Sequence, residues 1–144
     1  MYGIDFSKAS VAVASKLNRN PTEVGRVEIQ EASVSHLPFA NDFFDMITAV
    51  ETHFWWPDLP RDIREVLRVL KPGGTLILIA EIYKGRKTMT AQMAEKYLPI
   101  SGMKLSSAEK HPDLLVNAGY VEVEVFTDAR KGWICARAKK PSPA

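Results

Sequence analysis

The chain has 144 residues, of which 46% are hydrophobic and 25% charged, a balance typical of one globular domain. A net charge of +2 is too small to indicate nucleic acid or a membrane surface as a partner. The single cysteine, Cys135, excludes an internal disulfide, and no cysteine–histidine cluster has zinc spacing. We therefore expect no metal site and a reducing, cytoplasmic location. No apolar run approaches the length of a membrane span.

The first half of the chain alternates between short strands and one helix. Residues 2–6 are typical of the end of a buried strand, and Ser7 is a suitable N-cap for a helix over residues 8–18. Its apolar face would carry Ala9, Val13 and Leu17, and Pro21 would end it. Further strands are expected at residues 27–30 and 46–50, with a loop between them.

The second half begins with the clearest helix of the sequence, capped by Asp58 and ended by the stretch KPGG at residues 71–74. The unbroken apolar run at 75–80 predicts a strand buried on both faces. A short amphipathic helix is expected at 89–97, and Gly119 would end another. Residues 121–127 and 133–138 then predict a hairpin. The order indicates an α/β fold, mainly parallel, with a C-terminal antiparallel hairpin.

Polar side chains follow three of the expected strands, at the edge where open parallel sheets bind ligands. Asp5 ends the first strand, where a carboxylate can accept both hydroxyls of a ribose; alternatively, it supports the turn into the next helix. Ser33 and Val34 follow the second strand, where a hydroxyl and a backbone N–H would read the edge of an adenine. On spacing alone, those two belong to an ordinary loop.

The third stretch, ETHFWWPD at residues 51–58, follows the strand at 46–50. Glu51 and His53 would line a polar cleft, with three aromatic residues as its wall. The alternative is that the aromatic residues pack beneath the helix that starts at residue 59. Glu51 and His53 are also the candidates for a general base, although both could merely line the cleft.

Three stretches together, YGIDFS, SHLPFANDFFDMI and REVLRVLKPGGTLIL, resemble the class I S-adenosylmethionine-dependent methyltransferases of the small-molecule type, and the resemblance covers essentially the whole chain. It implies a Rossmann-like sheet over residues 1–138 and a disordered tail at 139–144. It also implies that S-adenosylmethionine contacts Asp5 at the ribose, Phe6, Ser33 and Val34 at the adenine, and Glu51 near the methionine end. Where many relatives have an aspartate, this chain has Ser33.

The family's first strand, glycine-rich loop and first helix are expected before the strand at residues 2–6, and the printed sequence does not contain them. KPGG is no substitute, because it precedes a strand instead of opening a helix. The resemblance therefore predicts a methyltransferase whose first βα unit is missing and whose cofactor binding is impaired. The two strand edges left open would pair with each other or with a second copy, and we expect a homodimer.

The expected function is methyl transfer from S-adenosylmethionine to an unidentified small molecule. Proximity and alignment can supply much of the acceleration, so a dedicated base is optional. One alternative is a methyltransferase-like remnant or interaction module without catalysis. A second is a dinucleotide-dependent oxidoreductase, which Asp5 alone would also fit, but the paired LPF…FD and RVLKPGG motifs argue against it.

Overall fold

The computed structural model describes residues 1–85, 89–97, 100, 102–128 and 130–143, and the chain forms two compact units, residues 1–38 and 39–144. The first unit holds β1 (Tyr2–Asp5), α1 (Lys8–Leu17), α2 (Arg19–Glu23) and β2 (Glu28–Glu31). β1 and β2 are parallel and form a two-stranded sheet. The second unit holds the remaining strands and helices.

The first helix begins where the sequence predicts, because the Ser7 hydroxyl accepts a hydrogen bond from the Ser10 N–H at 3.3 Å. Its end also agrees with the expected range, although Pro21 is not what ends it. Helix α1 closes at Asn18, and Pro21 lies inside α2 as its third residue. A proline is tolerated there because the N–H groups of a first helical turn have no partner within the helix.

The covered face of α1 is also not the predicted one. Val13 is 59% exposed and Leu17 is 80% exposed, and Ala9 lies on the same open side. The half-buried positions of α1 are Val11, Ala14 and Ser15, on a neighbouring stripe with helical spacing. Because α1 contacts β1 and β2 within this unit, the larger apolar face that the sequence suggested stays uncovered there.

The second unit is built on a four-stranded sheet in the order β3-β4-β6-β5. Its elements in chain order are β3 (Phe44–Val50), the 3₁₀ turn η1 (His53–Trp55), α3 (Leu59–Val69), β4 (Leu70–Ala80), α4 (Met89–Tyr97), α5 (Lys110–Ala118), β5 (Val121–Asp128) and β6 (Trp133–Lys139). β3 and β4 are parallel, whereas β6 runs antiparallel to β4 and β5. The expected α/β class and terminal hairpin are confirmed.

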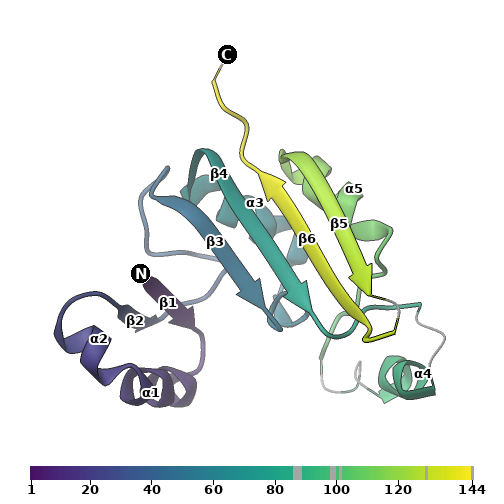
Figure 1. The fold of residues 1–144 in the computed structure, drawn as a ribbon, viewed down its shortest axis with the longest axis horizontal. Helices are drawn as coiled ribbons and strands as arrows, with labels where there is room; N and C mark the ends of the chain where they lie inside the picture. The colour runs from purple at the N-terminus through teal and green to yellow at the C-terminus, as the bar shows by residue number, and fades with distance from the viewer. Residues whose placement is uncertain (86–88, 98–99, 101, 129, 144) are drawn as a thin grey trace. The chain divides into compact units, whose positions relative to one another are not determined.

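Helix α3 supplies much of the core of this unit. The Asp58 carboxylate accepts from the Arg61 N–H at 3.2 Å, and the Asp62 carboxylate accepts from the Asp58 N–H at 3.0 Å, so the two residues cap the helix reciprocally. Ile63 and Val66 are almost fully buried, and α3 contacts β4 and α5. Figure 1 shows α3 and α5 on one face of the sheet.

Because α3 and α5 lie on one face of the sheet, the burial of β4 differs from the prediction. Leu76, Leu78 and Ala80 are buried, but the alternating residues Ile77 and Ile79 are only half-buried. The sequence predicted burial on both faces, because an unbroken apolar run cannot reveal which face is covered less. None of the helices within the described ranges has the length and apolar character needed to cross a bilayer.

The KPGG stretch belongs to β4 itself rather than to a separate turn. The register between β3 and β4 jumps here, from Phe44 opposite Leu70 to Met46 opposite Thr75. The chain is tight at Gly74, where a Cβ would lie 2.8 Å from the Lys71 carbonyl oxygen. The two adjacent glycines, Gly73 and Gly74, therefore permit the irregular start of β4.

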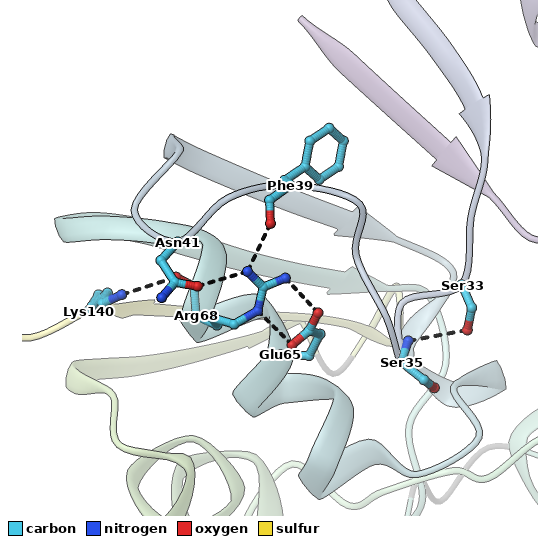
Figure 2. A network of polar contacts seen from close by, with 7 residues as sticks. All are labelled: Ser33, Ser35, Phe39, Asn41, Glu65, Arg68 and Lys140. Carbon is cyan, nitrogen blue, oxygen red and sulfur yellow. Dashed lines mark hydrogen bonds and ion pairs between the residues drawn. The ribbon is translucent and has the colours of Figure 1, made fainter.

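A polar network around Arg68 joins helix α3 to the loop that precedes β3 (Figure 2). Arg68 donates to both carboxylate oxygens of Glu65, at 2.7 and 2.9 Å, and to the Phe39 carbonyl at 2.8 Å and the Asn41 side chain at 2.9 Å. Lys140 donates to the Asp42 carboxylate at 2.7 Å and to the Leu70 carbonyl at 2.8 Å. Ordered hydrogen bonding thus continues past residue 138, where the sequence suggested that the tail begins.

Strand β3 is an edge strand of the four-stranded sheet and pairs with β4. Within the first unit, β1 pairs with β2. On the edge strand β3, Met46 is 57% exposed and Val50 is 52% exposed.

Candidate functional site

In the first unit, Asp5 ends β1, at the carboxyl edge of the parallel pair. One of its carboxylate oxygens accepts a hydrogen bond from the Ser7 N–H at 2.8 Å, so Asp5 does support the turn into α1. Its second oxygen has no hydrogen-bond partner among the described residues. The two interpretations of Asp5 are therefore compatible, and the carboxylate keeps an oxygen that could accept a ribose hydroxyl.

Ser33 and Val34 lie at the same edge, because β2 ends at Glu31, directly opposite Asp5 in the register. The Ala32 N–H donates to the Asp5 carbonyl at 3.0 Å and ties the two chain segments together. The Ser33 hydroxyl accepts from the Ser35 N–H at 3.2 Å, which closes a small turn (Figure 2). Phe6 follows Asp5 and is 76% exposed, so its ring is accessible for stacking.

Glu51 follows β3 in the second unit. Its backbone has a φ of +55°, a left-handed conformation that is uncommon for residues other than glycine. Its N–H donates to the Ile79 carbonyl at 2.9 Å, and its carboxylate accepts a short hydrogen bond from the Glu81 N–H. Glu51 therefore joins the carboxyl ends of β3 and β4, and its side chain is held by the protein itself.

His53 stands two residues further on and is 4% exposed. Its Nε2 lies 3.3 Å from Nε2 of His111, a residue of α5, and Nδ1 of His111 lies 2.8 Å from the Ser107 carbonyl oxygen. Burial, and to a smaller extent the neighbouring His111, lower the pKa of His53 to about 4. Burial also lowers the pKa of His111, against the opposing effect of the Ser107 carbonyl.

The aromatic residues of the loop divide between the two expected roles. Phe54 and Trp56 are buried, while Trp55 is 44% exposed. Phe54 belongs to a buried apolar cluster with Ala80, Met103 and Ile134. Only Trp55 of the three keeps a large open surface that a ligand could meet.

The sequence analysis missed two polar residues of this unit. His111 was not singled out, because it lies 58 positions from His53 and no spacing rule links the two. Asp62 is fully buried, with one carboxylate oxygen that has no partner among the described residues. Asp62 could have been recognised as a buried carboxylate, because it lies on the apolar side of the helix predicted from residue 59. No group of three metal-ligating side chains occurs in the described part of the chain.

A search of protein families matches residues 1–78 to the family described as "Methyltransferase domain". Methyltransferase GfsG of Streptomyces halstedii is 31% identical over 119 residues, covering 81% of this chain and 43% of that protein. O-methyltransferase cnsE of Penicillium expansum is 30% identical over 129 residues, covering 90% of this chain and 46% of that protein. The chain therefore spans less than half the length of these two relatives.

Among solved structures, the phosphoethanolamine N-methyltransferase 2 of Haemonchus contortus, in complex with phosphomonomethylethanolamine and S-adenosylhomocysteine, superposes with a TM-score of 0.79. It is 17% identical, and the match covers 98% of this chain and 44% of that one. This likeness concerns the fold. The fold is that of the Rossmann-like methyltransferases. The chain belongs to the methyltransferase domain family, whose cofactor is S-adenosylmethionine.

Proposed function

We propose that this chain binds S-adenosylmethionine and acts in methyl transfer to a small-molecule acceptor. The observation that carries the proposal is the family match over residues 1–78, which includes the β1 strand end with Asp5 and the Ser33–Val34 turn. The residues present fit the cofactor, since Asp5 keeps one unpartnered carboxylate oxygen and Phe6 an accessible ring. When bound, S-adenosylmethionine supplies an electrophilic methyl group.

In this proposal each residue has a definite task. Asp5 accepts the ribose hydroxyls, Phe6 packs on the adenine, and the Val34 N–H and Ser33 hydroxyl read its edge. Glu51 lies nearest the methionine end, but its hydrogen bond to the Glu81 N–H already occupies part of its carboxylate. Its contribution should therefore be smaller than that of Asp5.

The test is calorimetric titration with S-adenosylhomocysteine of this chain extended by the family's first strand, glycine-rich loop and first helix, because the printed chain alone is expected to bind the cofactor poorly. Asp5→Ala should weaken binding by about 1–3 kcal/mol, or roughly 5- to 160-fold, because a charged hydrogen-bond partner is lost. Asp5→Asn keeps an oxygen for the Ser7 N–H and should still weaken binding, whereas Glu31→Ala, the carboxylate opposite in the register, should not. Equal affinity of the Asp5→Asn variant and the unmodified chain would contradict the ribose assignment.

A second candidate is a methyltransferase-like interaction module without catalysis. It is favoured by the engagement of Asp5 and Glu51 with backbone N–H groups of the chain itself. Absence of any heat of binding with this extended chain would support this candidate and contradict the first.

We also infer that two copies associate through β3. Its edge is unpaired, and Met46 and Val50 expose apolar surface beside it. Sedimentation at micromolar concentration tests this, and Met46→Lys should shift a dimer toward monomer. A monomer for the unmodified chain would contradict the inference. The lone, half-buried Cys135 is compatible with a reducing cytoplasm, which remains the proposed location.

A further inference from the structure

The buried histidine pair of the second unit has only one arrangement of protons in which both rings are neutral. The Ser107 carbonyl can only accept, so Nδ1 of His111 carries a hydrogen. In a neutral ring Nε2 of His111 is then bare. Its 3.3 Å contact with Nε2 of His53 needs one hydrogen, which His53 must supply. Nδ1 of His53 is therefore the bare nitrogen of the pair.

That bare nitrogen is an acceptor without a donor. Nδ1 of His53 is buried and has no hydrogen-bond partner among the described residues. A buried polar atom left in this state is costly, and each such exception calls for an explanation, of which a functional role is one. The burial that lowers the pKa of both rings keeps them neutral, so the acceptor persists at physiological pH.

Two features of the surroundings restrict the chemistry of a donor. His53 follows β3 by three residues, on the strand-end side where ligands bind in sheets of this kind. Phe54, directly beside it, belongs to the apolar cluster described above. An apolar, desolvated setting disfavours a cationic donor, so a neutral hydroxyl or amine on an apolar molecule fits best.

We propose that Nδ1 of His53 accepts a hydrogen bond from a neutral hydroxyl or amine of the methyl acceptor, and that His111 is the positioning residue that fixes the His53 tautomer. This inference rests on the proposed methyltransferase function and adds the class of acceptor to it. Because Nδ1 is covered by protein in the structure, ligand binding must displace part of that cover.

The tautomer is tested by ¹⁵N nuclear magnetic resonance of the histidine side chains near pH 7. His53 should show a protonated Nε2 and a bare Nδ1, His111 the reverse, and the exposed His36 a rapidly exchanging mixture that serves as a reference. His111→Phe should release His53 to a mixture of tautomers. His111→Gln, whose amide oxygen can accept from Nε2–H of His53, should restore the single tautomer.

The ligand class is tested by titration with phenol and with anisole, its methyl ether, which lacks the donor. Phenol should shift the Nδ1 resonance of His53, and anisole should not; the phenol shift should weaken in His111→Phe and return in His111→Gln. A protonated Nδ1, an unchanged resonance at the highest phenol concentration, or an equal response to anisole would overturn the inference. So would a joint shift of both rings with Zn²⁺, which would mark a metal pair instead. Because the cofactor titration addresses Asp5 in the other unit, the two proposals can fail separately.

Discussion

The Arg68 network makes a quantitative prediction for the second unit. Arg68→Met removes the side-chain hydrogen bonds to Glu65, Phe39 and Asn41. A buried hydrogen bond to a charged group contributes about 1.5–3 kcal/mol, but the Arg68 side chain is 32% exposed, so water replaces part of the loss. Glu65 is 17% exposed and loses its cation. We expect a loss of about 1–2 kcal/mol in the free energy of unfolding.

The assay follows from where the tryptophans lie. Trp55, Trp56 and Trp133 all belong to residues 39–144, so tryptophan fluorescence during urea unfolding reports on this unit alone. Arg68→Lys keeps the charge but loses the planar fork, and it should recover less than half of the loss. Lys71→Met breaks the exposed ion pair with Asp45 and serves as the control, with no measurable change expected.

A double-mutant cycle with Glu65→Gln isolates the pair itself. If Arg68 acts through Glu65, the two substitutions should be non-additive by about 1 kcal/mol. Strictly additive effects, or a loss for Arg68→Met no larger than that for Lys71→Met, would refute the reasoning.

Four other changes can be measured in the same way. Leu78→Ala, in the fully covered face of β4, should lower the free energy of unfolding by about 2–5 kcal/mol. Gly74→Ala should cost more than about 1 kcal/mol, because its Cβ would lie 2.8 Å from a carbonyl oxygen, and a neutral result would contradict the tight packing. Tyr120→Phe should cost about 1 kcal/mol through loss of the 3.2 Å hydrogen bond to the Ile63 carbonyl. The pKa of His53 is lowered from 6.5 to about 4, so the unfolded chain binds more protons than the folded chain between these two pH values. The free energy of unfolding should therefore fall by about 3 kcal/mol as the pH falls through this range. His53→Gln should flatten the curve of urea midpoint against pH.

The sequence predicted the elements of the fold well because their signals are local. The cap at Asp58, the left-handed Gly119 with a φ of +102°, and the two strands of the terminal hairpin each depend on a few neighbouring residues. All three appear in the structure where they were expected. Pro112 occupies the third position of α5, within its first turn, where a proline is tolerated.

The predictions that differ depend on what packs against an element. The exposed side of α1, with Val13 and Leu17, cannot be distinguished from a core face by helical spacing alone. The same holds for Ile77 and Ile79 of β4, which are half-buried because the described helices α3 and α5 lie on the opposite face. Burial is a property of neighbours distant in sequence.

In the candidate site too, local features were predictable from the sequence and contacts between distant residues were not. Asp5 was predictable from its place after a strand, and the cofactor roles of Asp5, Phe6, Ser33, Val34 and Glu51 stay predictions. The partner of His53 was not predictable, because α5 and η1 meet only in the folded unit. The proposed homodimer likewise depends on which surfaces of two folded copies meet, and a sequence pattern does not contain that information.

The strand order β3-β4-β6-β5 has a consequence for biosynthesis. Strand β6 follows β4 and β5 in the sequence but lies between them and is hydrogen-bonded to both. During translation β4 and β5 therefore lack their shared neighbour until residues 133–139 have been synthesised. The first unit, with β1 and β2 both within 38 residues, can pair its strands long before. A premature stop before Trp133 would thus leave the facing edges of β4 and β5 open at once, and the product should be a substrate for chaperones and proteases.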